Sequence, residues 1–223
     1  MTRLTQFSGD LAHEMRTPIA TLLGRTQVAL SQTRDVESLR DTLASNVEES
    51  ERLTRLITDM LFLGQFEQDK QSLGRDVLQL DVEANLVAEF LMDVAEERQL
   101  QIVVVGKAAV SANRLLVQRA ITNLLSNAIR RANEMRVIEV AIEQSQTMVT
   151  LTVANVGGAI ARADLQRIFE RFYRVDADRS RGSGGTGLGL AIVRSIMNMH
   201  DGAVIAASSA DGRTTFQLRF PLI

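Results

Sequence analysis

The sequence predicts an α+β protein in which a helical hairpin precedes a mixed domain of strands and helices. Helical periodicity runs through residues 1–66, and a polar stretch follows at 67–76. Over residues 77–223, β-branched strand patterns mix with helical ones without strict alternation. We therefore expect two domains, at 1–66 and 77–223, joined by a linker at 67–76.

Two long amphipathic helices joined by a short turn are predicted for the first domain. Apolar residues from Leu4 to Ala29 fall near one face of the first helix, and those from Leu39 to Leu61 form a stripe on the second. The polar residues 31–35 between them supply a turn and an N-cap. Because one hairpin cannot bury both stripes, we expect a homodimer in which a second copy completes a four-helix bundle.

The second domain is expected to be a sandwich, with a mostly antiparallel sheet and helices on one face. Helices are predicted at 82–98, 114–131 and 190–199. Strands are predicted at 77–80, 100–105, 138–143, 148–154, 203–207 and 214–220.

Composition excludes several classes of protein. The 223 residues carry a net charge of −2 and no cysteine, which excludes disulfides, zinc fingers and thiolate catalysis. Basic residues are scattered, so no nucleic-acid partner is expected. No apolar run approaches the roughly 18 residues of a membrane helix, and no signal peptide opens the chain. We therefore expect a cytoplasmic piece of a longer protein.

His13 is the candidate nucleophile. On a helix, its neighbours three and four positions away carry no large apolar group, so its imidazole is expected to face water and to be mostly neutral at pH 7. A neutral ring nitrogen is a nucleophile, and Glu14 is placed to take its proton. A surface histidine beside a surface glutamate explains this window equally well. The second histidine, His200, is expected at a helix end without a catalytic role.

Five glycines lie within the eight residues 182–189. Glycines let backbone amides approach an anion closely, and a helix is predicted to begin where they end, so the segment is typical of a phosphate-binding turn. It is not a P-loop, because no Lys-Ser/Thr pair follows the last glycine, and it is not a Rossmann turn, because no strand immediately precedes it. The alternative is a flexible linker, which would rarely lead straight into the apolar residues 188–193.

Asn123 and Asn127 are four residues apart on a predicted helix, so both carboxamides project from one face, which Arg130 joins. Amide oxygens beside a guanidinium suit a magnesium-bound polyphosphate, and a plain polar helix face is the alternative. In residues 153–160, a predicted strand ends in a polar residue that is followed by two glycines. A simple turn is the alternative interpretation of this segment. Residues 168–174 hold three of the nine aromatic residues and form either a lid anchor or a local core cluster.

The order and spacing of these segments resemble those of the sensor histidine kinases of two-component systems, over essentially the whole chain. Residues 13–18 match the H box of that family, and residues 123–127 match its N box. Residues 155–157 lie where its G1 box lies, residues 169–172 match its F box, and residues 185–189 match its G2 box.

The resemblance implies a dimerisation and histidine-phosphotransfer hairpin followed by an ATP-binding α/β sandwich of the Bergerat type. It implies autophosphorylation of His13 by ATP, with magnesium bound by Asn127, and phosphotransfer to an aspartate of a response regulator. Thr17 matches a position that often supports phosphatase activity towards the regulator. The nucleotide-binding residues that it implies are Asn123, Asn127, Arg130, Asn155, Gly157, Phe172, Tyr173, Gly185, Thr186, Gly187, Leu188 and Gly189.

Two positions depart from the family pattern. Asn155 replaces the aspartate that usually accepts the adenine amino group, and because an uncharged acceptor is typically weaker, we expect reduced ATP affinity. Arg131 stands where an aromatic residue is common. A weakly ATP-binding dimeric module that acts mainly as a regulator phosphatase is therefore an alternative. Another Bergerat ATPase of the chaperone, topoisomerase or mismatch-repair type is a second alternative, against which the H box argues.

Residues 45–49, 59–63 and 155–157 look most like the heavy-metal sensor subgroup, especially copper and silver sensors. The parent protein is then expected to be a bacterial inner-membrane protein, attached to the membrane through segments absent from this chain. No sensing-metal site is expected here, because two distant histidines and no cysteine cannot build one.

Overall fold

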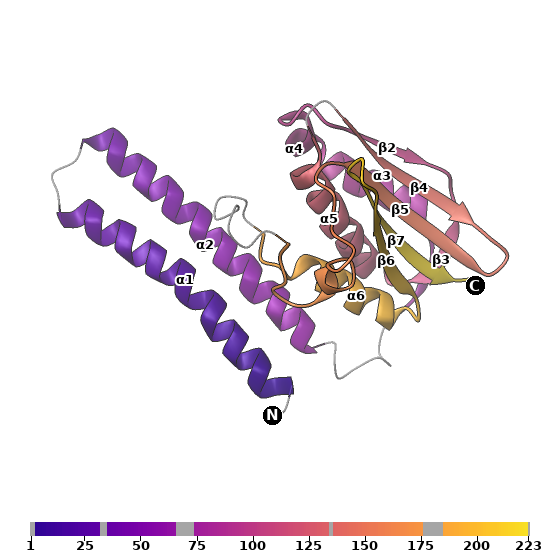
Figure 1. Ribbon diagram of the computed structural model, residues 1–223, viewed down its shortest axis with the longest axis horizontal. Helices are drawn as coiled ribbons and strands as arrows, with labels where there is room; N and C mark the ends of the chain where they lie inside the picture. The colour runs from indigo at the N-terminus through magenta and orange to yellow at the C-terminus, as the bar shows by residue number, and fades with distance from the viewer. Residues whose placement is uncertain (1–2, 32–34, 66–73, 134–135, 176–184, 223) are drawn as a thin grey trace. The chain divides into compact units, whose positions relative to one another are not determined.

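The computed structural model describes residues 3–31, 35–65, 74–133, 136–175 and 185–222. The chain divides into two compact units, Met1–Gly64 and Gln65–Ile223 (Figure 1). Most of the predicted linker, up to residue 73, lies outside the described residues, and its last residue, Asp76, belongs to a strand. Within the described ranges, no helix is long and apolar enough to cross a membrane.

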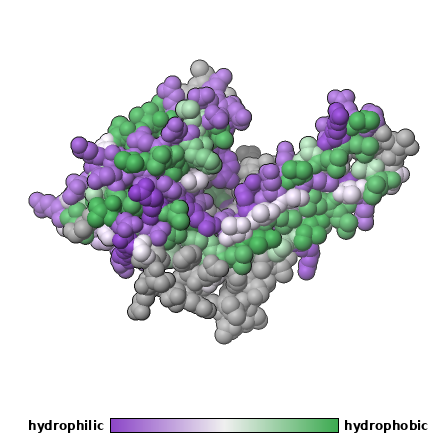
Figure 2. Space-filling model, turned by 180° about the vertical axis from the view of Figure 1, so that it is seen from behind, coloured by the Kyte–Doolittle hydropathy of each residue, from purple (hydrophilic) through white to green (hydrophobic). Residues whose placement is uncertain are grey.

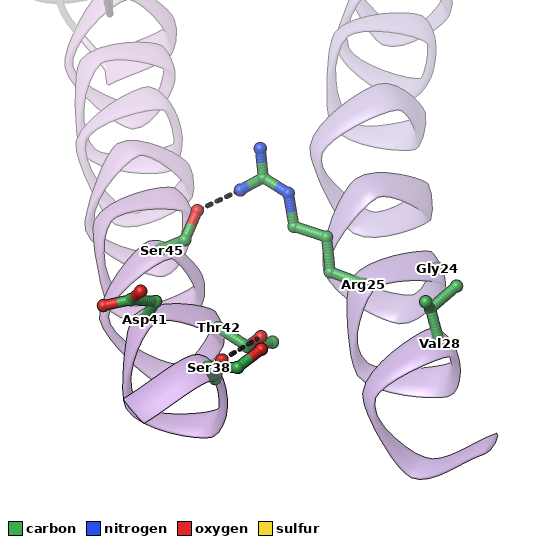
Figure 3. Close-up of a pocket in the computed structure, with 7 residues that line it drawn as sticks. All are labelled: Gly24, Arg25, Val28, Ser38, Asp41, Thr42 and Ser45. Carbon is green, nitrogen blue, oxygen red and sulfur yellow. Dashed lines mark hydrogen bonds between the residues drawn. The ribbon is translucent and has the colours of Figure 1, made fainter. Parts of the chain in front are cut away.

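The first unit is a hairpin of two helices, α1 (Arg3–Ser31) and α2 (Val36–Gln65) (Figure 1). Asp35 caps α2, because its carboxylate accepts the backbone N–H of Ser38 at 2.7 Å. Side chains also join the two helices. The Asn46 amide donates to the Thr26 hydroxyl at 3.0 Å, and the Arg25 guanidinium donates to the Ser45 hydroxyl beside a shallow groove near the turn (Figure 3).

Large apolar side chains remain exposed along the hairpin, and Figure 2 shows them as green patches on its surface. Leu23, Leu43, Val47 and Leu61 are each more than half exposed. Uncovered apolar rows of this kind are what the expectation of a second copy requires.

The second unit is built on a five-stranded sheet in the order β2-β4-β5-β7-β6. Its strands are β2 (Gln101–Val105), β4 (Val137–Gln144), β5 (Met148–Val156), β6 (Ala203–Ser208) and β7 (Arg213–Pro221). The pair β2–β4 is parallel and the other three pairs are antiparallel, as the prediction of a mostly antiparallel sheet requires. A separate antiparallel pair joins β1 (Asp76–Gln79) to β3 (Ala109–Ala112).

Helices cover one face of this sheet (Figure 1). They are α3 (Leu80–Phe90), α4 (Met92–Glu96), α5 (Arg114–Arg131) and α6 (Gly189–Met199), with the short 3₁₀ helix η1 (Arg167–Phe169) near α6. Alternate residues of the central strands, such as Val140, Leu151 and Phe216, are buried beneath them. The single helix predicted at 82–98 is wrong: the helix breaks at Leu91, whose backbone N–H is shared between two carbonyls.

His200 ties the ends of α5 and α6 together. It caps the C-terminus of α6 and is almost completely buried. Its Nδ1 lies 2.8 Å from the Ile196 carbonyl, and its Nε2 accepts the backbone N–H of Asn113 at 3.0 Å. Asn113 is in turn the N-cap of α5. These partners require the neutral ring with the proton on Nδ1, and burial lowers the pKa of His200, assisted by the charge of Arg75.

The lowered pKa of His200 predicts a pH-dependent stability. Below about pH 6.5 the unfolded chain binds a proton that the folded chain does not, so the free energy of unfolding falls by up to about 1.4 kcal/mol per pH unit, until the pH passes the folded pKa. Above about pH 6.5, the stabilising contribution of the neutral His200 is fully present. Denaturant unfolding can be followed by the fluorescence of Tyr173, the only tyrosine in a chain without tryptophan. We expect His200→Gln to reduce the slope between pH 6.5 and 5, and His13→Gln to retain it. Equal slopes in the wild type and His200→Gln would contradict this account.

Candidate functional site

The asparagine face of α5 forms one wall of the candidate site. The bounds of α5 agree with the predicted helix 114–131, and its apolar residues, such as Leu124 and Ala128, are buried. Asn123 and Asn127 are half-buried, one turn apart. The Asn123 amide nitrogen donates to the Arg119 carbonyl at 3.0 Å. The Asn127 side chain makes no hydrogen bond among the described residues and is therefore available to a ligand.

The glycine turn reaches the same place from α6. Gly185 to Leu188 precede this helix, which begins at Gly189, while residues 182–184 lie outside the described part of the chain. A Cβ atom at position 189 would lie 2.9 Å from Oδ1 of Asn123. The start of α6 therefore lies in close contact with the Asn123 amide, and a side chain at position 189 would require that amide to shift. The first backbone N–H groups of a helix have no partner within it and bind anions, so the turn and the asparagine face form a candidate anion site.

The aromatic segment supports this turn. Phe172 donates its backbone N–H to the Gly187 carbonyl at 3.0 Å. Gly187 has a φ of +71°, and a Cβ atom there would lie 2.9 Å from Cα of Phe172. Phe169 instead belongs to the core, because its ring meets that of Phe216 edge-on at a centroid distance of 6.4 Å. The core interpretation of residues 168–174 therefore holds for Phe169, and the lid-anchor interpretation stays a prediction. The Thr186 hydroxyl accepts the backbone N–H of Leu188 at 3.4 Å.

Asn155 supplies a buried polar group at the end of β5. The residue is 4% exposed overall and lines a small pocket together with Ala154 and Val156. Thr214, opposite it on β7, is also 4% exposed, and its hydroxyl lies 2.9 Å from that of Ser208. The carboxamide of Asn155 can both donate and accept hydrogen bonds. Asn155 therefore fits a pocket for a polar ligand.

Gly157 brings the end of β5 against the C-terminus of α5. Its backbone N–H donates to the Gly212 carbonyl at 2.9 Å. A Cβ atom at this position would lie 2.0 Å from the Arg131 carbonyl. The G1 segment and the asparagine helix thus meet because position 157 has no side chain.

Positive charge gathers at the C-terminal end of α5. Arg130 is exposed overall. Partial burial of its guanidinium lowers its pKa, and the positive charges of Arg131 and Arg174 lower it further. An arginine keeps its charge at neutral pH all the same. Arg131, whose role the sequence leaves open, therefore adds to a positive field that would attract an anion.

Among the described residues, no group of three or more His, Cys, Asp or Glu side chains could hold a metal ion. Asn127 offers one amide oxygen. Magnesium is commonly bound by one or two protein oxygens together with substrate phosphates and water. The donor set therefore fits a metal that arrives with a polyphosphate.

His13, Glu14 and Thr17 all lie on α1, in the other unit. Glu14 is half-buried and Thr17 is exposed. The His13 side chain lies outside the described part of the structure, so its expected exposure remains a prediction. Pro18, which the helix includes, is buried.

Known families match both units. Residues 3–69 match the His Kinase A (phospho-acceptor) domain, and residues 112–223 match the histidine kinase-, DNA gyrase B-, and HSP90-like ATPase family. The chain belongs to the sensor histidine kinases. The resemblance inferred from the five sequence boxes is therefore confirmed.

Curated relatives of this kinase include three sensor proteins. Sensor protein IrlS of Burkholderia pseudomallei is 45% identical over 98% of the chain and 47% of its own length. Sensor protein CzcS of Cupriavidus metallidurans is 41% identical over 99% of the chain and 46% of its own length. Sensor histidine kinase CusS of Escherichia coli is 42% identical over 99% and 46%. The chain thus spans about half the length of the curated relatives it matches.

Solved structures confirm the fold of the kinase. The Acinetobacter baumannii histidine kinase AdeS aligns with a TM-score of 0.76 at 22% identity, over 94% of this chain and 98% of that one. Histidine kinase ThkA, solved in complex with the response regulator protein TrrA, aligns with a TM-score of 0.78 at 21% identity. The alignment covers 99% of this chain and 62% of that one. The α+β architecture of hairpin and sandwich is therefore shared.

Sequence reasoning missed two polar residues beside the site of the kinase. Thr214 occupies an inward position of β7 that is otherwise apolar, and this break in alternation was a usable signal. Asp164 receives the Tyr173 hydroxyl at 2.5 Å. No local pattern marks this contact, because it depends on how the chain turns between the two residues.

The close contact at Gly187 predicts a large cost for any side chain there. Gly187→Ala would place a Cβ atom against the Phe172 backbone in a left-handed conformation, which should lower the free energy of unfolding by at least about 1–2 kcal/mol. Gly158→Ala is the matched control: a Cβ atom there meets nothing within 4 Å, so a change within about 0.5 kcal/mol is expected. Denaturant unfolding of both variants checks this, and equal costs would show that the contact is absent.

Proposed function

We propose that the chain is the catalytic region of a sensor kinase that transfers the γ-phosphoryl group of ATP to His13, and from there to an aspartate of a response regulator. The observation that carries this proposal is the contact of Gly189 with the Asn123 amide, which brings the glycine turn to the asparagine face of α5. The buried Asn155 lies in the same unit. Its other support is the match of the second unit to an ATPase family and of the first to a phospho-acceptor domain.

Base recognition is assigned to Asn155. Its carboxamide lines a small pocket, and its oxygen can accept a hydrogen bond from the amino group of adenine. Gly157 completes the environment of the base in this proposal, whereas Phe172 and its neighbour Tyr173 are assigned to the side of the phosphate-binding turn. The contacts of the described residues give the Asn155 amide no structural role.

Phosphate binding is assigned to the turn Gly185–Gly189, to Asn123 and to Arg130. The backbone N–H groups at the start of α6 and the positive charge near Arg130 both favour a polyanion. Asn127 would hold magnesium through its amide oxygen. Bound there, magnesium would neutralise part of the phosphate charge.

The transfer itself needs a neutral imidazole at His13. A ring nitrogen of His13 forms a bond to the γ-phosphorus in line as the bond to the β–γ bridging oxygen breaks, and ADP leaves with that oxygen. The proton of the imidazole passes to Glu14, its neighbour on α1. The contributions of the protein are positioning and charge stabilisation, as in other phosphoryl transfers.

The hairpin is proposed to form a homodimer and to bind the regulator. The exposed apolar rows of α1 and α2 support a second copy. Thr17, one turn after His13 and exposed, is proposed to support removal of phosphate from the regulator. The domains are proposed as 1–66 and 77–223 with a linker at 67–76.

A role in metal-responsive signalling is proposed from the likeness of residues 45–49, 59–63 and 155–157 to heavy-metal sensors. The parent protein would lie in a bacterial inner membrane, with this region in the cytoplasm. The relatives are about twice as long as this chain, which leaves room in them for the sensing region.

A second candidate function is a dimeric regulator phosphatase with weak ATP binding. Asn155 favours it, because an amide supplies a neutral acceptor where an aspartate would supply a charged one. Absence of ATP binding at millimolar concentrations with magnesium, together with intact dephosphorylation of the regulator, would favour this function over the kinase.

Autophosphorylation is the direct test of the first proposal. Incubation of the chain with γ-labelled ATP and magnesium should give acid-labile label, because a phosphohistidine forms. His13→Gln should lose this label entirely, since no other residue is proposed to accept it. Thr17→Ala serves as the matched α1 control and should retain the label. Label that survives in His13→Gln would remove this histidine from the mechanism.

Asn155→Asp tests the base contact. A charged acceptor should strengthen the hydrogen bond to the adenine amino group, so ATP affinity should rise by up to about tenfold. Isothermal calorimetry with ATP measures this, and Asn155→Leu should weaken binding. An affinity that is the same in all three proteins would show that residue 155 does not contact the base.

A further inference from the structure

We propose that Tyr173, Asp164 and Arg167 form a latch that positions the glycine turn for the nucleotide phosphates. The inference rests on the proposed ATP site and assigns Tyr173 a positioning role there. These three residues, called the Tyr173 latch below, all lie in the segment before the glycine turn.

Two contacts hold the Tyr173 side chain from different directions. Its hydroxyl donates to Oδ1 of Asp164 at 2.5 Å, a short hydrogen bond to a carboxylate. The Arg167 guanidinium lies over its ring, 4.2 Å from the centroid, and pairs with Glu170 at 3.8 Å. The phenol is therefore fixed at its tip and on its face, and its proton is committed to Asp164.

The residue beside the latch has an unusual backbone. Phe172 has a φ of +63°, in the left-handed region that costs a non-glycine residue free energy. Such a conformation persists only where the surroundings enforce it. On one side, Phe169 is anchored in the core against Phe216. On the other side, the Tyr173 latch holds the next residue in place, so Phe172 is constrained from both ends.

This conformation of Phe172 is transmitted directly to the glycine turn. The Phe172 N–H donates to the Gly187 carbonyl at 3.0 Å, and the two backbones touch where a Cβ atom at Gly187 would not fit. Two residues later, Gly189 begins α6 against Oδ1 of Asn123. The path from Tyr173 to the proposed phosphate site therefore consists of a side chain, one hydrogen bond and two adjacent backbone segments.

The electrostatics of Tyr173 agree with a structural use of its hydroxyl. The hydrogen bond to Asp164 raises the pKa of the phenol, and burial acts in the same direction. The hydroxyl thus remains a donor at physiological pH. Because the Tyr173 latch acts through Phe172, its loss should affect the phosphate end of the ligand and spare the base, which Asn155 contacts.

The test compares ATP with adenosine on variants of the full chain. Tyr173→Phe removes only the hydroxyl, and Asp164→Leu removes only its acceptor. Each should weaken ATP binding by about tenfold, as expected for a hydrogen bond to a charged group, while adenosine affinity stays unchanged. Asp164→Asn keeps an acceptor and should stay within about threefold of the wild type. The double variant Tyr173→Phe/Asp164→Leu should be no weaker than either single one.

Competition against one labelled nucleotide gives both affinities in the same assay. Equal losses for ATP and adenosine would overturn the latch, since general loosening of the domain predicts them. Unchanged ATP affinity in Tyr173→Phe and Asp164→Leu would overturn it as well. Failure of the wild type to bind ATP would instead remove the proposed function, and the latch with it.

The contact itself has an independent spectroscopic signature. Tyr173 is the only tyrosine in the chain, so phenolate absorbance titrates this residue alone. In the wild type it should appear at a higher pH than the ordinary midpoint near 10, and Asp164→Leu should move it back towards that value. A wild-type midpoint at or below the ordinary value would overturn the latch.

Discussion

The close packing of the glycine turn, against α5 at one position and against the Phe172 backbone at another, is the constraint on which the candidate site depends. Gly189 lets the first turn of α6 rest against the Asn123 amide, and Gly187 lets the preceding turn touch the Phe172 backbone. A side chain at position 189 would require the Asn123 amide to move, and one at position 187 would collide with the Phe172 backbone. The glycines thus contribute to the shape of the candidate site alongside its charged groups.

The relative position of α5 and α6 is fixed at a second point, far from the glycines. His200 at the end of α6 accepts the backbone N–H of Asn113, the cap of α5. With a rise of about 1.5 Å per residue, Asn113 to Asn123 and Gly189 to His200 each span roughly 15–17 Å. Two antiparallel segments of nearly equal length are thus joined at both ends. A shift of one helix along the other would break the hydrogen bond of His200 or the contact of Gly189, which explains how a buried, non-catalytic histidine serves the site.

Local patterns predicted those parts of the molecule whose causes are local. The apolar spacing of residues 114–131 predicts a helix whose bounds agree with α5, and the asparagines on its polar face follow from the same period. Strand β3 was missed because Ala109–Ala112 is short and rich in alanine, and it exists only through pairing with β1. The inward Thr214 breaks the apolar alternation of β7 and could have been recognised from the sequence. The hydrogen bond of Tyr173 to Asp164, like strand β3, could not be predicted from a local pattern. Each depends on the path of the chain between distant segments, which no periodicity encodes.

The charges around the proposed site predict a preference for a highly charged ligand over a neutral one. The positive charges of Arg131 and Arg174 lower the pKa of Arg130, because they repel its guanidinium. A polyphosphate placed among them and at the start of α6 would remove that repulsion and gain attraction at once. The free energy of binding should therefore become more favourable as the negative charge of the ligand increases. Salt screens exposed charges over about 10 Å at 0.1 M. The proposed preference for triphosphate over diphosphate should therefore narrow as ionic strength rises, whereas the proposed contact of Asn155 with the base should not change.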